Sequence, residues 1–395
     1  MEFEKVVYVR YFPLTKAIYR DLYFEELLDN DIQVDYLDLT AFFFPDKITS
    51  DDFNFGGTVK INSFKELEVY LKNQDNQNTL YISIMTFEWR VFRLFRLFTK
   101  FNLKIGVFAR GVFPSDTETD KKSKIVKFIK AINYKKIMAF CTNKIIFLAK
   151  RSGYIKSYDY IFKAGDNGYW GLGIGSEIDY QNAKIIEVNT VDYDQFILNK
   201  KLQPVHNEEY IVFLDQYLPY HPDTSYFKIK TVKPEPYFKE VNHFFDRLEL
   251  ATGKKVIIAA HPKAERYKEF NPYNTRSVFF NQSNDLVKEA SLVLTHASTA
   301  ICFPICYEKK IVLLASDYLT EVLPTFLVIA KAIVNACDAT LIAMDKEKEI
   351  IIEEKINFEK YSDFKYKYLT SKVSENHLSK DIFISFLKLE DKFPQ

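Results

Sequence analysis

The chain has 395 residues, which is longer than a single hydrophobic core usually serves, so its length favours two domains. Hydrophobic residues make up 47% and charged residues 27%, which excludes a disordered chain, and 11 glycines with 13 prolines exclude a fibrous one. The net charge is only +1, but residues 81–163 carry 18 Lys or Arg against five acidic residues. This local excess of 13 positive charges indicates an anionic partner or a solvated basic face.

Short β-branched runs alternate with longer amphipathic stretches along the whole chain, a pattern typical of parallel sheets covered by helices on both faces. In the first half, strands are expected over 5–9, 79–84, 104–108, 144–147 and 158–162. Helices are expected there over 86–101 and 121–135. In the second half, strands are expected over 210–215, 255–260, 292–295 and 310–314. Helices are expected there over 234–251, 284–290 and 298–307.

The polar segment from about 188 to 208 has no clear period and contains Pro204, so we expect a linker and a domain boundary there. The predicted domains are 1–204 and 205–345, followed by a helical segment over 346–395. Two similar α/β halves suggest a ligand cleft between them.

Four scattered cysteines, Cys141, Cys302, Cys306 and Cys337, are too few for a disulfide framework and indicate buried thiols in a reducing compartment. The first residues have neither the basic nor the apolar region of a secretion signal. No apolar run reaches the roughly 18 residues of a membrane span. We therefore expect a cytoplasmic protein that can still touch a membrane surface.

His261 and Pro262 directly follow the expected buried strand 255–260. In open parallel sheets this carboxyl end faces the ligand crevice, and proline delays the start of the next helix. The imidazole can then donate a hydrogen bond to a phosphate oxygen. The alternative is a loop histidine without a function.

Ser298 and Thr299 follow the strand 292–295 and open a helix, so either hydroxyl can cap the helix. The free backbone N–H groups of the first helical turn favour an anion. An ordinary helix cap without a ligand is the alternative. The His261 and Ser298 turns are about one βαβ spacing apart, which we interpret as neighbouring turns of one phosphate site.

Asp166 lies between Gly165 and Gly168, again just after a strand. The glycines allow a tight turn that presents the carboxylate to the cleft, where it can act as a general base. A plain Asx-type turn is the alternative. We also expect Asn167, Gly168, His221, Lys263 and His296 to line the cleft.

An acidic residue with a glycine, then a His-Pro pair, then a Ser/Thr pair resembles the motifs of bacterial GT-B sialyltransferases and polysialyltransferases. The resemblance covers these three short motifs and the two-domain layout. It implies a GT-B fold with two Rossmann-like domains facing a central cleft and C-terminal helices. It also implies that His261, Pro262, Ser298 and Thr299 bind the phosphate of a CMP-activated sugar and that Asp166 is the base. Asn167 departs from the pattern, because it stands where the family has a second acidic residue.

Other nucleotide motifs are absent from the sequence. Gly171, Gly173 and Gly175 do not have the spacing of a dinucleotide fingerprint, and no Walker A sequence occurs. Asp192 and Asp194 form one Asp-x-Asp, which we interpret as solvated because it lies in the expected linker.

Residues 89–100 form a basic, helix-compatible segment. On a helical projection Arg90, Arg93, Arg96 and Lys100 share one arc, and Val91, Leu94, Phe95 and Phe98 share another. With Lys121, Lys122, Lys124, Lys127 and Lys130, these cations could rest on anionic lipid or an acidic acceptor. The alternative is a helix with a solvated charged face. No recognition motif supports nucleic acid.

The resemblance therefore implies an inverting glycosyltransferase of surface-polysaccharide assembly that needs no metal or other cofactor. Its expected partners are a CMP-activated acidic sugar, a glycan acceptor that can be lipid-linked, and the anionic inner face of the plasma membrane. The alternatives are a UDP-sugar-dependent GT-B transferase, a GT-B-like sugar-nucleotide epimerase, and a non-enzymatic polymer-binding protein.

Overall fold

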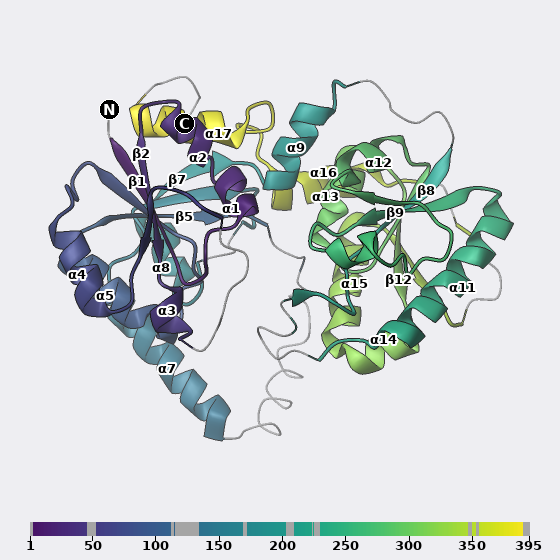
Figure 1. Cartoon of the computed structure of the whole chain (residues 1–395), viewed down its shortest axis with the longest axis horizontal. Coiled ribbons are helices and arrows are strands. Elements are labelled where there is room, and N and C mark those ends of the chain that lie inside the picture. Colours follow the sequence, from purple (N-terminus) through teal and green to yellow (C-terminus); the bar gives the residue numbers. More distant parts are fainter. Residues whose placement is uncertain are drawn as a thin grey trace. The chain divides into compact units, whose positions relative to one another are not determined.

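A computed structural model describes residues 3–45, 53–111, 114, 134–168, 172–202, 209–222, 224, 230–346, 350–352 and 355–389, without the side chains of 134–140 and of Thr299. The chain forms two compact units (Figure 1). Unit 1 comprises Met1–Val112, Thr119–Val191 and Tyr368–Gln395, and almost all of unit 2 is Asp192–Lys367.

Unit 1 is built on a parallel sheet, whose described strands have the order β3-β2-β1-β4-β5-β6-β7. The strands are β1 (Lys5–Arg10), β2 (Gln33–Asp38), β3 (Thr58–Lys60), β4 (Thr79–Ser83), β5 (Lys104–Ala109), β6 (Tyr160–Ala164) and β7 (Lys184–Val188). Its helices are α1 (Lys16–Asp21), α2 (Phe24–Leu28), α3 (Thr40–Phe43), α4 (Phe64–Lys72), η1 (Trp89–Val91), α5 (Phe92–Lys100), α7 (Tyr134–Arg151), α8 (Ser176–Asn182) and α17 (Ser379–Lys388).

Unit 2 has a second parallel sheet, with the order β10-β9-β8-β11-β12-β13. The strands are β8 (Tyr210–Leu214), β9 (Lys255–Ala260), β10 (Val278–Phe280), β11 (Leu292–Thr295), β12 (Ile311–Ala315) and β13 (Thr340–Ala343). The longer helices are α9 (Val191–Asn199), α11 (Pro234–Thr252), α12 (Ser283–Glu289), α14 (Asp317–Val322), α15 (Pro324–Cys337) and α16 (Phe358–Phe364). Shorter turns are η2 (Glu265–Lys268), η3 (Thr299–Ile301), α13 (Cys302–Cys306) and η4 (Lys365–Leu369).

The predicted strand over 144–147 is wrong, because these residues lie inside α7. Their side chains follow a helical pattern, because the buried residues Ile146 and Lys150 are four apart, whereas Ile145 and Leu148 are 53% and 52% exposed. A short apolar run is compatible with either a strand or a helix, and this one forms part of an 18-residue helix. Most of the predicted helix 121–135 lies outside the described residues.

The predicted linker is also wrong in part, because α9 occupies it and belongs to unit 2. The side-chain amide of Asn284 donates to the Gln195 carbonyl over 2.9 Å, and Phe196 packs against the ring of Tyr307. These contacts place the division between the units at 191–192, earlier than residue 204. Asp192 and Asp194 are half-buried in the first turn of this helix rather than in a solvated linker.

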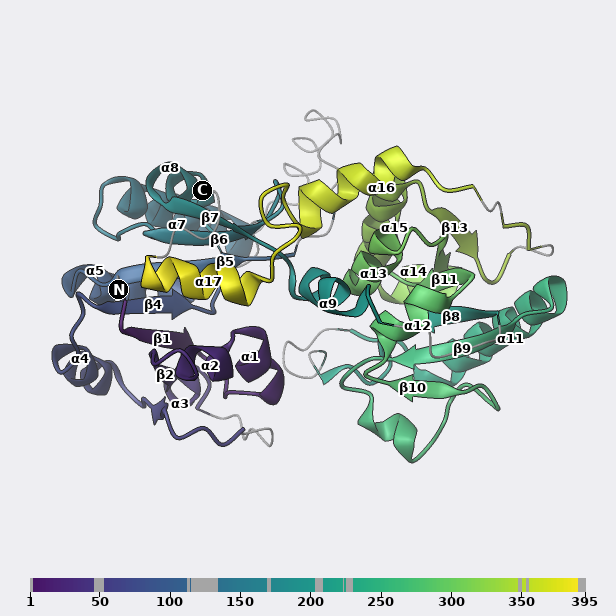
Figure 2. The ribbon, with the colours of Figure 1, turned by 90° about the horizontal axis from the view of Figure 1, so that it is seen from above.

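The segment 346–395 is not a separate helical domain, because its helices belong to different units. Tyr361 of α16 donates to the carbonyl of Lys309 over 2.8 Å within unit 2. Phe383 of α17 packs instead against Phe162 of β6 and Phe108 of β5, with ring centroids 4.8 and 5.3 Å apart. Figure 2 shows α17 lying along the sheet of unit 1.

Three of the four cysteines, Cys302, Cys306 and Cys337, are buried or half-buried, as predicted. Cys141 is exposed on α7, so the prediction of a buried thiol is wrong there. Cys141 lies on α7, the same helix that contains the wrongly predicted strand 144–147.

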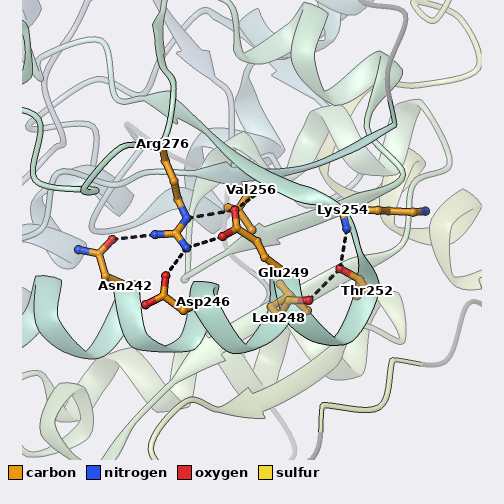
Figure 3. Close-up of polar contacts among 8 residues, drawn as sticks. All are labelled: Asn242, Asp246, Leu248, Glu249, Thr252, Lys254, Val256 and Arg276. Atoms are coloured by element: carbon orange, nitrogen blue, oxygen red, sulfur yellow. Dashed lines mark hydrogen bonds and ion pairs between the residues drawn. The ribbon is translucent and has the colours of Figure 1, made fainter.

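A buried arginine holds α11 against the sheet of unit 2 (Figure 3). Arg276 lies just before β10 and is 8% exposed. Its Nη2 donates to Glu249 Oε2 over 2.6 Å and to Asp246 Oδ1 over 2.7 Å, and Glu249 Oε1 also accepts from the backbone N–H of Val256 at the start of β9. The two carboxylates of α11 compensate a charge that would be costly to bury alone.

Each sheet has one point where the strand order reverses direction. In unit 1 this point lies between β1 and β4, and in unit 2 it lies between β8 and β11. In open parallel sheets, the loops at the carboxyl ends of such strands form the ligand crevice. The candidate residues of both units can therefore be judged by their distance from these two points.

Candidate functional site

The carboxyl ends of β9, β8 and β11 lie side by side in unit 2. Leu214 of β8 pairs with Ala259 of β9 on one side and with Thr295 of β11 on the other. The sequence spacing predicted that the turns after β9 and β11 are neighbours. This prediction is wrong, because β8 lies between the two strands. Two strand spacings, about 10 Å, separate their backbones, so side chains from both turns can reach one small anion or nucleotide.

His261 is the first residue after β9, and it is half-buried. Its Nδ1 accepts a hydrogen bond from the backbone N–H of Lys263 over 3.1 Å. The neutral ring then carries its proton on Nε2, which is the donor that a phosphate oxygen requires. Pro262 and Lys263 are exposed beside it.

A second histidine lies next to His261, although it comes from a different loop. The ring of His221, in the loop after β8, lies with its centroid 5.0 Å from the ring of His261, edge to face. The structure thus brings together two of the histidines that the sequence singled out. Both could face an anion, since each carries one N–H even when neutral.

Ser298 lies in the turn after β11 and is 9% exposed. Its Oγ accepts from the backbone N–H of Ala300 over 3.2 Å, which leaves the hydroxyl proton available to a ligand. The helix expected over 298–307 is present as the short 3₁₀ helix η3 followed directly by the five-residue α13. The backbone of Thr299 opens η3, and its side chain lies outside the described residues.

His296 does not line a ligand site, contrary to the prediction. It is fully buried, its Nδ1 lies 2.8 Å from the Leu314 carbonyl, and its Nε2 lies 3.1 Å from the Tyr237 hydroxyl. The carbonyl can only accept, so Nδ1 donates and Nε2 accepts. Burial lowers the pKa of His296 to about 4, and the neutral ring joins β11 to β12.

Two residues directly after β8, Asp215 and Gln216, also belong to this site, although the sequence did not predict them. Asp215 is buried and accepts a hydrogen bond from the Tyr273 hydroxyl over 2.7 Å. Burial raises the pKa of its carboxyl to about 6, and the nearby backbone N–H groups of Gln216, Tyr217 and His261 lower the pKa by less. The sequence does contain a signal for Asp215, because this carboxylate directly follows the apolar strand β8.

Gln216 connects the end of β8 to the Ser298 turn. Its Nε2 donates to the carbonyl of Ala297 over 2.7 Å, directly before Ser298. Its Oε1 is buried and has no hydrogen-bond partner in the described part of the chain. Asp215 and Gln216 therefore fix the positions of the His261 turn and the Ser298 turn.

Asp166 follows β6 in unit 1, at the carboxyl edge of that sheet. Gly165 has φ +65°, and a Cβ on Gly168 would lie 2.5 Å from the Ala109 carbonyl at the end of β5. Only glycine allows this close approach, and both Asp166 and Asn167 are exposed on the turn. Gly168 is buried and does not line an open surface.

The two acidic residues beyond this turn differ in accessibility. Asp179 is fully buried and pairs with the Lys150 ammonium over 2.5 Å, so it cannot take a proton from a substrate. Burial raises the pKa of Asp179 to about 6 and lowers the pKa of Lys150. Glu177 is exposed and remains the alternative base.

The basic residues of 89–100 lie on the outer side of η1 and α5, whereas Val91, Leu94, Phe95 and Phe98 are buried, as predicted. The guanidinium carbon of Arg93 lies 4.1 Å from the ring centroid of Phe64. The guanidinium carbon of Arg96 lies 4.2 Å from the ring centroid of Tyr154. Lys100 pairs with Glu68 over 2.7 Å. Lys121, Lys122, Lys124, Lys127 and Lys130 lie outside the described residues.

Within the described ranges, no helix is long and apolar enough to cross a bilayer. Among the same residues, no three His, Cys, Asp or Glu side chains gather in a way that could hold a metal ion.

Comparison with known proteins shows the fold of the chain. No family model and no curated protein matches it. Wall teichoic acid polymerase TagF superposes with TM-scores of 0.50 and 0.51, the latter after a soak with CDPG, at 11% identity, covering 98% of this chain and 89% of that chain. UDP-GlcNAc 2-epimerase from Methanocaldococcus jannaschii reaches a TM-score of 0.45 at 13% identity, covering 98% of this chain and 99% of that chain. The two Rossmann-like units with parallel sheets therefore form a GT-B fold, as expected.

Proposed function

We propose that this protein is an inverting, metal-independent glycosyltransferase that moves an acidic sugar from a CMP-activated donor to a surface glycan. The observation that supports the proposal is the arrangement around β8, where the His261 turn and the Ser298 turn lie on either side of one central strand. This is the reversal point of the sheet, where such folds bind ligands. The acidic donor sugar itself rests on the motif resemblance.

Unit 2 supplies the groups that stabilise the leaving nucleotide in this proposal. His261 donates through Nε2 and Ser298 donates through its hydroxyl, both to phosphate oxygens. The charge that develops on the phosphate as the sugar leaves is then stabilised by donors already held in place. His221 adds a second imidazole next to the first.

Unit 1 supplies the base. Asp166 is an exposed carboxylate on a tight glycine turn, which suits removal of a proton from an acceptor hydroxyl. Inversion requires one such base and no enzyme-bound nucleophile. Asn167 leaves Asp166 as the single acidic residue of the motif.

The decisive assay measures CMP release from CMP-sialic acid with and without an oligosaccharide acceptor. We expect release to depend on the acceptor and to continue in EDTA. Acceptor-independent conversion of a UDP-sugar would instead identify an epimerase, and acceptor-dependent release of UDP would identify a UDP-sugar transferase. Glycan binding that survives His261→Ala without any nucleotide release would identify a polymer-binding protein.

We also propose that unit 1 attaches reversibly to the anionic inner face of the plasma membrane. A groove of about 320 Å³ between α4 and α5 is lined in part by the cations Lys65, Arg93, Arg96 and Lys100. Trp89 and Tyr154 near this face are 55% and 52% exposed. Cations with exposed aromatic side chains favour the headgroup region of an acidic bilayer.

A further inference from the structure

A pocket of about 250 Å³ lies in unit 1 at the point where its strand order reverses. Its walls come from the carboxyl ends of β1, β4 and β5 and include Arg10, Tyr11, Phe12, Ser83, Met85 and Phe108. The volume is below the roughly 300–1,000 Å³ of sites for drug-sized ligands, so it suits one sugar ring better than an oligosaccharide.

An arginine with an uncompensated charge stands beside this pocket. The guanidinium carbon of Arg110 lies 4.1 Å from the ring centroid of Phe108, one wall of the pocket, and 5.2 Å from that of Tyr23. Its Nη1 donates weakly to the Asp21 carbonyl over 3.4 Å, whereas its Nε and Nη2 are buried and have no hydrogen-bond partner. No carboxylate among the described residues pairs with it. Arg110 as a whole is half-buried, and buried guanidinium nitrogens without a partner favour an anion nearby.

The pocket and Asp166 belong to the same edge of the sheet. The Gly165–Gly168 turn packs so closely on β5 that a Cβ on Gly168 would lie 2.5 Å from the carbonyl of Ala109, the residue before Arg110. Arg110 and Asp166 therefore follow two adjacent, paired strands, β5 and β6. The turn that carries Asp166 thus adjoins the end of β5, one of the strands that line the pocket.

We propose that this pocket binds a negatively charged sugar, whose carboxylate or phosphate is paired by Arg110 and whose ring lies against the aromatic walls. Arginine recognises both anions through its planar set of N–H donors. Arg10 provides a second cation in the wall, with its guanidinium carbon 5.4 Å from the ring centroid of Phe12. That the sugar is the acceptor rests on the function proposed above, whereas the binding itself does not.

The test is direct binding, measured by calorimetry on the full-length protein without any nucleotide. The probes are glucuronic acid for a carboxylate, glucose 6-phosphate for a phosphate, and glucose as the neutral control. We expect at least one anionic sugar to bind about 10-fold or more tightly than glucose, since hydrogen bonds between charged groups are worth more than neutral ones. Equal binding of all three sugars by the wild type would overturn the proposal.

Variants then assign the preference to Arg110. Arg110→Gln should remove the anion preference and leave glucose binding unchanged, and Arg110→Lys should keep part of it. Arg151→Gln is the matched control, because it removes one positive charge from an exposed position of the same unit. Unchanged preference in a folded Arg110→Gln protein would contradict the proposal. If the wild type binds anionic sugars but transfers nothing, the pocket stands and the glycosyltransferase proposal fails.

Discussion

His261 and His296 both follow buried strands of unit 2, yet their surroundings give them opposite roles. His296 has both ring nitrogens bound to protein groups and a pKa lowered to about 4 by burial, so it is a neutral structural residue at any physiological pH. His261 is half-buried in a turn, and its Nδ1 contact keeps the Nε2 proton as the donor. Accessibility, not residue type, separates the candidate ligand group from the structural one.

The first prediction concerns His261. His261→Ala should abolish transfer and weaken nucleotide binding by about 1.5–3 kcal/mol, because a hydrogen bond to a charged phosphate is lost. Calorimetric titration with CMP measures the effect. His243→Ala is the matched control, since His243 is exposed on α11 and belongs to neither of the two turns. Near-normal CMP affinity in His261→Ala would remove this residue from the site.

The second prediction separates the base from the nucleotide site. Asp166→Asn should reduce turnover roughly 10²–10⁴-fold, the usual contribution of a general base, while CMP affinity stays near the wild-type value. Steady-state kinetics and CMP titration of one preparation give both numbers. Glu177→Gln should keep its activity. The reverse result, an active Asp166→Asn and an inactive Glu177→Gln, would reassign the base to Glu177.

The third prediction concerns the buried carboxyl of Asp215. Its pKa is raised from 3.8 to about 6, so between these values the folded protein binds a proton that the unfolded chain has released. The contribution of this group to stability therefore falls as the pH rises from about 4 to 6. Asp215→Asn lacks this penalty and can still accept from Tyr273. The difference in free energy of unfolding between Asp215→Asn and the wild type should therefore rise in favour of the variant, by an amount on the order of 2 kcal/mol, from pH 4 to pH 7.

Urea unfolding of both proteins at several pH values tests this prediction. The difference between variant and wild type isolates Asp215 from Asp179, whose pKa is also raised to about 6. A difference that is constant from pH 4 to pH 7 would show that burial does not hold the Asp215 carboxyl in its protonated form.

The sequence could predict which strand ends carry polar groups but not which of those groups are exposed. His261 and Asp166 were found because each follows a recognisable strand and has an adjacent proline or glycine. Gln216 was missed because its role depends on a contact with Ala297, which is far away in the sequence. The burial of His296 likewise depends on Tyr237 and Leu314, which no local pattern reveals.

At the level of elements, the helices α5 and α11 were predicted, whereas part of the long helix α7 was predicted as a strand and short or edge strands were missed. The apolar face of α5 follows a 3.6-residue period and packs as expected. β3 and β10 have three residues each, too few for a periodic signal. β7 forms one edge of its sheet, and its Lys184 and Ile185 are exposed. Such an edge strand lacks the buried apolar run of a central one.

The fourth prediction concerns the basic face of η1 and α5. Changing Arg90, Arg93, Arg96 and Lys100 together to Gln should abolish binding to acidic vesicles, because each basic residue near such a surface contributes about 1 kcal/mol. Activity on a short soluble acceptor should remain. Cosedimentation with phosphatidylserine vesicles at low salt measures the binding, which should also fall steeply as salt is added.

A second variant with the same charge serves as the control for this experiment. It carries Gln in place of four exposed lysines of unit 2: Lys230, Lys239, Lys255 and Lys268. This control should sediment like the wild type. Equal sedimentation of the wild type and the η1–α5 variant would contradict the membrane role and favour an acidic acceptor chain on this face.

At the scale of the whole molecule, the two-unit α/β architecture followed from the alternation of strands and helices. The return of α17 to unit 1 could not be predicted, because it depends on aromatic contacts between Phe383 and two strands more than 200 residues earlier in the chain. The same holds for the pocket at the reversal point of unit 1. Its walls come from three strands, and no segment contains a motif that marks it.

The central claim is that unit 2 binds a cytidine nucleotide at the carboxyl ends of β8, β9 and β11. The most direct test is a thermal-shift panel of CMP, UDP and GDP with the wild-type protein. Ligands that bind only the folded state raise the midpoint in proportion to the logarithm of their concentration over Kd. CMP should raise the unfolding midpoint more than UDP or GDP does. Stabilisation by UDP or GDP without CMP, or by none of the three, would contradict it.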